Sequence, residues 1–210
     1  MNDGKFVASS LREDELFTFY RADGVRDTLS TGKAPYPFRF QGIDDTSLKV
    51  KKRIFEYRLK YNGHNDKFVV CYCLNNLFEI YNSDGSLHKR IIAPYPYLVD
   101  TNHLSADKLG VPIAELIFTF KDCCLTDDRI FLLYNGSSPT GMIGAQSKIY
   151  VFDYEGNPIK YYLLDRYAHS FCIDKQGGVI YALSDENDQK QVVRYSICLL
   201  YTSPSPRDCS

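Results

Sequence analysis

The histidines are the side chains of this sequence best suited to chemistry near neutral pH, because an imidazole can exchange a proton or bind a polar ligand there. The 210-residue chain has four, namely His64, His88, His103 and His169. The first two lie in polar or charged runs and are expected to face solvent. His103 and His169 fall in segments that connect strand-like runs, and Arg166 and Tyr167 closely precede His169. We therefore predict a ligand-binding rim of Arg166, Tyr167, His169 and His103. The alternative is an ordinary polar surface loop.

A group of aspartates gives the second candidate site. Asp122, Asp127 and Asp128 could form a paired-carboxylate or calcium site, but their spacing does not match an EF-hand loop. Asp127 and Asp128 are explained as well by a hairpin turn, in which Asp is common. The adjacent Cys123 and Cys124 would point to opposite faces of a strand, which suits packing better than joint metal ligation. We predict neither a metal site nor a cofactor.

Motifs for nucleophilic catalysis and nucleotide binding are absent from the sequence. It has no G-x-S-x-G, no P-loop and no G-x-G-x-x-G. The seven cysteines include no C-x-x-C pair, and most lie in apolar runs where a thiol behaves as a small hydrophobic group. We therefore expect mostly buried thiols and no catalytic centre built on these motifs.

Charge and hydropathy restrict the partners. The formal net charge is −1, so the chain lacks the basic field that holds nucleic acids, and we predict no nucleic-acid partner. The densest basic run is residues 49–53, expected to be the solvated start of a strand. No apolar stretch approaches the ~20 residues of a membrane helix, so we predict no transmembrane segment.

Repeated strand–turn units must position these side chains. Three segments align without gaps, residues 16–24, 77–85 and 148–156, and each runs from a strand into an acidic residue followed by Gly. The acid-Gly step favours a hairpin turn because Gly adopts positive φ without steric cost. A second β-rich run follows each turn, at residues 25–29, 87–92 and 159–164. These pairs are predicted to be the outer hairpins of a repeated unit.

Further strands, up to two per unit, are predicted before the outer hairpins. The nearer ones are predicted at residues 5–8, 67–70, 129–132 and 179–182, and the innermost ones at 55–61, 118–125 and 170–174. Four short antiparallel strands per unit are typical of propeller blades. Insertions at 38–52 and 102–116, the latter with a possible helix start at 105–108, would lengthen the repeat. The predicted fold class is therefore all-β, a partial β-propeller of about three to four blades, with a β-sandwich as the alternative.

The C-terminal residues differ in character from the rest. The string from Cys198 to Asp208 is identified as the translation of a transposase-based sequencing adaptor. We therefore expect an incomplete propeller domain over residues 1–197 and a non-native, disordered tail over 198–210.

Residues 78–85, 147–160 and 168–174 carry a family resemblance. This pattern of strands and turns resembles the six-bladed TolB-like β-propeller lipoproteins of Bacteroidota cell envelopes. The resemblance implies a bacterial envelope location and a longer parent protein, anchored through an N-terminal lipid signal that this sequence lacks. It transfers no functional residues.

Two functions are compatible with these observations. The first is a non-catalytic binding or scaffold propeller that recognises a protein, peptide or glycan with the loops of one ring face. The second is a propeller hydrolase or lactonase-like enzyme whose site residues lie largely in other blades. The innermost strands carry mainly Phe, Cys, Ile and Leu, with Asp122 the clearest polar exception, so the first function is favoured.

Overall fold

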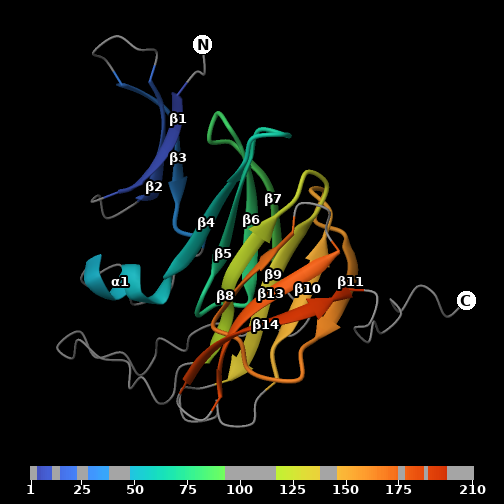
Figure 1. Cartoon of the computed structure of the whole chain (residues 1–210). Helices are drawn as coiled ribbons and strands as arrows, with labels where there is room; N and C mark the ends of the chain where they lie inside the picture. The colour runs from blue at the N-terminus through green and yellow to red at the C-terminus, as the bar shows by residue number, and fades with distance from the viewer. Residues whose placement is uncertain are drawn as a thin grey trace, which may run out of the picture.

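Four antiparallel sheets follow one another along the chain in the computed structural model (Figure 1). The structure describes residues 4–10, 15–22, 28–37, 48–92, 117–137, 146–174, 178–186 and 189–197. Each sheet is built from strands that are consecutive in sequence and pair with their neighbours. A β-sandwich would have two sheets, so the predicted partial propeller is confirmed and the sandwich alternative is not.

Sheets B and C have the four strands expected of a blade. Sheet B consists of β4 (Tyr57–Asn62), β5 (Lys67–Tyr72), β6 (Leu77–Asn82) and β7 (Leu87–Ile92). Sheet C consists of β8 (Phe118–Leu125), β9 (Ile130–Ser137), β10 (Lys148–Phe152) and β11 (Pro158–Leu163).

Sheets A and D each have three strands among the described residues. Sheet A consists of β1 (Gly4–Ser9), β2 (Glu15–Ala22) and β3 (Thr28–Pro35). Sheet D consists of β12 (Ser170–Ile173), β13 (Val179–Glu186) and β14 (Gln189–Ser196). By chain order, sheet A has the second to fourth strands of a blade and sheet D the first to third.

A separate hydrophobic core lies between each pair of consecutive sheets. Phe17 and Phe19 of sheet A pack with Phe68 and Tyr81 of sheet B, with ring centroids 5.1–5.5 Å apart. A second core joins sheets B and C, and a third joins sheets C and D. Stacking every sheet on the next through its own core is the arrangement of propeller blades.

The innermost strands β4, β8 and β12 lie side by side. Asp122 in β8 accepts hydrogen bonds from the Ser170 hydroxyl and, at 3.3 Å, from the Phe171 N–H, both in β12. The buried Thr119 hydroxyl donates to carbonyls of sheet B, including Tyr72 O at 3.0 Å. Polar side chains of β8 therefore connect three consecutive blades.

Acid-Gly turns close the outer hairpins of sheets B and C, as predicted. Gly85 has φ 90° and Gly156 has φ 79°, values that favour glycine. The carboxylate of Asp153 accepts the N–H groups of Glu155 and Asn157 at 3.0 and 2.8 Å. The corresponding turn at Gly24 lies outside the described residues.

The basic run at 49–53 forms a helix instead of a strand, so that prediction is wrong. Helix α1 (Leu48–Ile54) has Lys51, Lys52 and Arg53 in its last turn, where the helix dipole stabilises positive charge. Ile54 and Phe55 are buried against sheets A and B. Lys and Arg are good helix formers, and burial of this end stabilises the short helix. The helix start expected at 105–108 lies outside the described residues.

Candidate functional site

The link between β11 and β12, residues 164–169, carries three of the four predicted site residues. A buried polar network holds its backbone. The Ser147 hydroxyl donates to Asn135 Oδ1 at 2.5 Å and accepts the Ala168 N–H at 2.8 Å. Asn135 Nδ2 in turn donates to Ala168 O at 3.2 Å, and Ser184 Oγ donates to Tyr167 O at 2.6 Å. The link is thus fixed by sheets C and D together.

His169 lies immediately before the innermost strand β12, as expected. Its Nε2 hydrogen-bonds Asp185 Oδ2 at 2.7 Å, and its backbone N–H donates to Leu183 O at 2.8 Å. The Tyr167 ring meets the His169 ring edge-on, with centroids 5.0 Å apart. About a third of the His169 side chain is exposed, so the imidazole is held by its carboxylate partner and remains accessible.

Arg166 lies beside a second carboxylate. Its Nε donates to Asp165 Oδ1 at 3.2 Å, and the Tyr195 hydroxyl of β14 donates to the same oxygen at 2.5 Å. These hydrogen bonds lower the pKa of Asp165. Burial and the bond to Asp165 raise the pKa of Tyr195, and burial raises that of Tyr167. Both phenols therefore stay protonated at neutral pH, and the Tyr195 hydroxyl acts as a donor to Asp165.

We call the group Asp165, Arg166, Tyr167, His169, Asp185 and Tyr195 the link rim. It combines a guanidinium, an imidazole–carboxylate pair and two tyrosine side chains on a fixed backbone, with the Tyr167 hydroxyl itself buried. Among the described residues, no Ser, Thr or Cys side chain hydrogen-bonds the His169 ring, so the rim holds no nucleophile–base pair. Its groups suit recognition of hydroxyl, amide or charged groups. His103 lies outside the described residues.

The aspartates considered as a second site are used within the fold. Asp122 joins β8 to β12, as described above. The exposed Asp128 accepts from Thr126 Oγ1 at 3.2 Å and pairs with Arg129 NH1 at 3.0 Å, which is turn chemistry. The described residues contain no group of three or more His, Cys, Asp or Glu that could hold a metal ion.

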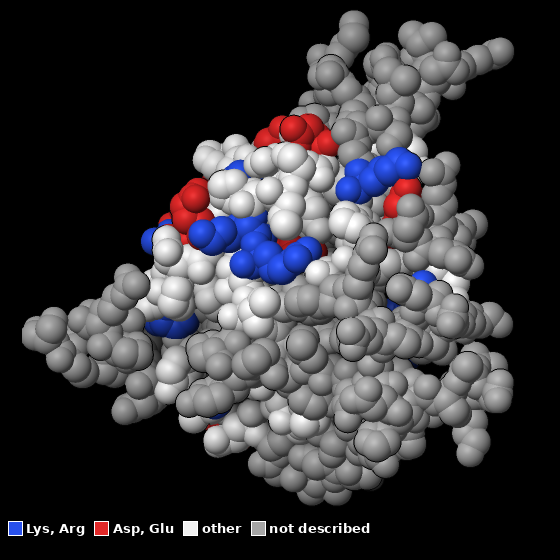
Figure 2. All heavy atoms as spheres, turned by 180° about the vertical axis from the view of Figure 1, so that it is seen from behind, with Lys and Arg blue, Asp and Glu red and all other residues white. Residues whose placement is uncertain are grey.

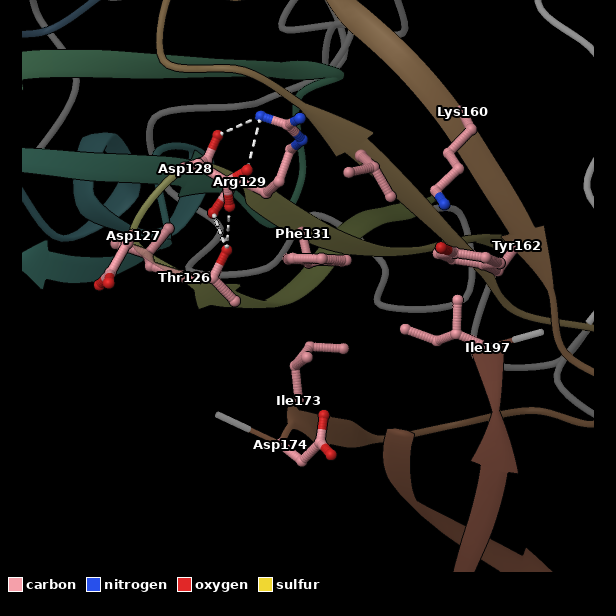
Figure 3. Close-up of a pocket in the computed structure, with 12 residues that line it drawn as sticks. Thr126, Asp127, Asp128, Arg129, Phe131, Lys160, Tyr162, Ile173, Asp174 and Ile197 are labelled. Atoms are coloured by element: carbon pink, nitrogen blue, oxygen red, sulfur yellow. Dashed lines mark hydrogen bonds and ion pairs between the residues drawn. The ribbon is translucent and has the colours of Figure 1, made fainter. Parts of the chain in front are cut away.

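A cavity of about 630 Å³ lies between sheets C and D, at the end of the sheets that carries the β8–β9 turn. Figure 3 shows the side chains of Phe131, Tyr162, Ile173 and Ile197 facing one space, with Asp174 beside it. Lys160 Nζ lies 4.9 Å from the Tyr162 ring centroid. The lining mixes these apolar side chains with charged ones, and the polar share of its surface is the larger.

Three residues of the link rim, Asp165, Asp185 and Tyr195, were not predicted from the sequence. Asp185 and Tyr195 come from strands of sheet D and lie 16 and 30 residues after their partners. The β12–β13 and β13–β14 pairings bring them back to the link. The strand alternation of 189–196 gives a partial signal, since Tyr195 falls on the inward face. No pattern in the sequence indicated the cavity between sheets C and D.

On the face drawn in Figure 2, the charged side chains lie in small groups. Figure 2 shows Lys and Arg side chains in separate clusters, some beside Asp or Glu, on a mostly uncharged described surface. No helix among the residues the structure describes is long and apolar enough to cross a membrane.

Comparisons with known proteins identify the family. The model of the TolB-like 6-blade propeller-like family matches residues 1–176. Solved structures that align with the chain include a eukaryotic initiation factor, at 9% identity and TM-score 0.42, and Saccharomyces cerevisiae Sqt1, at 12% identity and TM-score 0.28. These alignments cover 96% and 89% of this chain but 42% and 56% of those structures. The chain therefore spans less than two thirds of either structure. No curated protein matched.

Proposed function

Because the chain belongs to the TolB-like 6-blade propeller-like family, we propose that it is a non-catalytic binding or scaffold propeller of a bacterial cell envelope. Its ligand is a protein, peptide or glycan, and the link rim is its recognition surface. Propellers display loops on a rigid ring, and function resides in those loops.

The observation that carries this proposal is the fixed backbone under the rim. The backbone of the link is held by a hydrogen-bond network of the Asn135, Ser147 and Ser184 side chains. The side chains of Arg166 and His169 stay partly exposed. A binding site loses less entropy on association when its polar groups are already ordered. This support is independent of the family assignment.

Each rim side chain has a distinct role in recognition. The Arg166 guanidinium, beside Asp165, offers donors to a carboxylate, carbonyl or sugar hydroxyl. The Asp185–His169 pair accepts or donates according to the state of the imidazole. Tyr167 adds an aromatic edge. Such a mixture suits hydroxyl- and amide-rich ligands better than apolar ones.

The test is an array of envelope oligosaccharides, peptidoglycan fragments and peptides, probed with the intact chain. We expect binding to at least one class, and loss of that binding in the variants Arg166→Ala and His169→Ala. The matched control is Lys89→Ala, an exposed cation on β7. Binding that is equal in all three variants would exclude the rim as the site.

The His169–Asp185 pair favours one second candidate, a hydrolase or lactonase-like enzyme, because a carboxylate-oriented imidazole can serve as a general base. Hydrolysis of p-nitrophenyl esters and aliphatic lactones, with and without added Ca²⁺ or Zn²⁺, tests it. Turnover that is lost in His169→Ala would support the enzyme, while unchanged background rates would support the binding protein.

A further inference from the structure

Three cations lie close together at the innermost strands of sheets B and C. Arg53 is near the end of helix α1, Arg58 lies in β4 and Lys121 lies in β8. Figure 1 shows α1 leading into β4, with β4 and β8 side by side. Both sheets have the four strands of a blade. We call Arg53, Arg58 and Lys121, together with Glu56, the cation cluster.

The alternation of side chains along β4 turns Arg58 towards sheet C. Its neighbours Tyr57 and Leu59 pack against the core between sheets A and B, so Arg58 points to the opposite face of its sheet. Its cross-strand partner Cys71 belongs to the core between sheets B and C, on that same face. Arg58 therefore faces the blade that contains Lys121.

Backbone hydrogen bonds hold β8 against sheet B beside the cation cluster. The Cys73 N–H donates to Glu56 O at 2.7 Å, and the Thr119 N–H donates to Cys73 O at 2.8 Å. Lys121 follows two residues after Thr119. Burial raises the pKa of the Cys73 thiol to about 11, and the charges of Arg58, Glu56 and Lys121 also act on it. These three side chains therefore lie around one buried thiol.

The cation cluster has one carboxylate for three cations. The Glu56 carboxylate pairs with Arg53 NH1 at 2.5 Å and with Arg58 NH1 at 3.5 Å. The Lys121 ammonium lies 4.2 Å from the Phe118 ring centroid and forms no ion pair with a described carboxylate. The cluster therefore has a net charge of +2, and both guanidinium groups remain partly exposed.

Lys121 distinguishes the cation cluster from ordinary surface ion pairs. The side chain is half-buried. Burial lowers the pKa of Lys121, and the charges of Arg58 and Arg53 lower it further. An ammonium that is partly removed from water beside two other cations is unfavourable until an anion joins it.

We propose that the cation cluster binds the phosphate group of a phosphate monoester, either a lipid headgroup or a soluble ester. Such a phosphate carries a charge of about −1.5 to −2 near neutral pH and so matches the charge of the cluster. A carboxylate or a phosphodiester would leave one cation unbalanced. The guanidinium groups offer paired donors to phosphate oxygens, and Lys121 adds a point charge from the neighbouring blade. The site is separate from the link rim and does not depend on the proposed function.

A heteronuclear NMR titration of the full chain with methyl phosphate tests the charge match. At pH 7.5 and constant ionic strength, we expect saturable shifts of the amide signals of Arg58 and Lys121. Dimethyl phosphate and acetate carry a single negative charge and should bind at least about fivefold more weakly. Equal affinity for the three anions, or shifts that do not saturate, would overturn the proposal.

Substitutions test the residues directly. Lys121→Gln and Arg58→Gln should each weaken methyl phosphate binding at least about fivefold, because each removes a charged donor. Lys121→Arg keeps the charge and should retain most of the affinity. The matched control is Lys89→Gln, an exposed cation on β7, which should bind as the unmodified chain does. Unchanged affinity in Lys121→Gln and Arg58→Gln would exclude the cation cluster as the site.

Vesicles of phosphatidylcholine, with and without phosphatidic acid, identify the source of the phosphate. Sedimentation with phosphatidic acid that is lost in Lys121→Gln would assign a lipid headgroup. Saturable binding of methyl phosphate without such sedimentation would assign a soluble ester, and absence of both would overturn the proposal. Phosphate binding should persist in Arg166→Ala, so failure of this site is distinguishable from failure of the link rim.

Discussion

Glu79 Oε1 accepts a hydrogen bond from Arg90 Nε at 2.6 Å, although the Glu79 side chain is completely buried in sheet B. The hydroxyls of Tyr72 and Tyr81 donate to Glu79 Oε2 at 2.7 and 2.8 Å. A buried carboxylate is tolerated only when it is paired and hydrogen-bonded. This network therefore fixes the third and fourth strands of the blade while placing a charge inside it.

Removal of the cation from this network should destabilise the chain. Arg90→Met keeps most of the aliphatic stem but leaves the buried Glu79 carboxylate without its counter-charge, and we expect a loss of about 2–3 kcal/mol in the free energy of unfolding. Chemical denaturation measures it. The neighbouring exposed change Lys89→Met should alter stability by less than about 0.5 kcal/mol. Equal effects of the two substitutions would contradict the role given to the pair.

Stability should fall in alkali. Burial raises the pKa of Cys73 from 9.0 to about 11, and burial followed by the Glu79 charge raises the pKa of Tyr72. Below pH 9 the Cys73 thiol is protonated in both states and contributes no pH dependence. Between pH 9 and 11 the unfolded thiol loses its proton while the folded one keeps it, which favours unfolding by about 1.4 kcal/mol per unit of pKa difference.

Denaturation midpoints measured from pH 7 to 11 check this expectation. The midpoint should be level up to about pH 9 and then decrease, and Cys73→Ala should reduce the slope while the tyrosines maintain part of it. A midpoint that stays level to pH 11 in the unmodified chain would show that these groups are not buried as described.

The sequence predicted the elements with strong local signals. The acid-Gly turn at Gly85 fixes the start of the following outer strand, so β7 coincides with the predicted range 87–92; the innermost strand β8 also coincides with its predicted range, 118–125. Helix α1 was missed because a basic run beside two apolar residues is compatible with either an exposed strand start or a short helix. Packing on sheets A and B determines which of the two structures forms. Asp185 could not be matched to His169, because the strand pairing that brings them together cannot be read from a single sequence.

The cysteines should react with a thiol reagent in an order set by burial. Among the described residues, Cys172 is exposed, Cys124 is half-buried with its pKa raised by burial, and Cys71, Cys73 and Cys123 are buried. Reaction needs the thiolate and access, so Cys172 should react first with a disulfide reagent at pH 8. Stopped-flow absorbance measures the phases.

The thiol experiment needs two controls. Cys198 and Cys209 lie outside the described residues and are replaced by Ser in the test protein. The change Cys172→Ser should then remove the fast phase, and denaturant should release the three buried thiols. A fast phase that survives Cys172→Ser would contradict the described arrangement of β12.

Residues 198–210 are proposed to be no part of the folded domain. A chain ending at Ile197 should have the same denaturation midpoint as the whole chain, because Ile197 packs against the core between sheets C and D and needs no later residue for that contact. A chain ending before Tyr195 should be less stable, since that cut removes both Tyr195 and Ile197 from this core. A clear loss of stability on removal of 198–210 alone would show that the tail belongs to the fold.

The Ser147 hydroxyl should be required for the order of the link rim rather than for ligand contact. Ser147→Ala leaves Asn135 Oδ1 without this donor and the Ala168 N–H without its acceptor, and both groups are buried. Each buried polar group left without a partner costs about 1–3 kcal/mol. We expect lower stability, faster amide exchange at Ala168 and weaker binding of any rim ligand. Ser86→Ala, in an exposed turn, is the control and should change neither exchange at Ala168 nor binding. Normal protection of Ala168 in Ser147→Ala would mean that the backbone of the link is held by other contacts, and the preordered rim on which the binding proposal rests would then lose its structural basis.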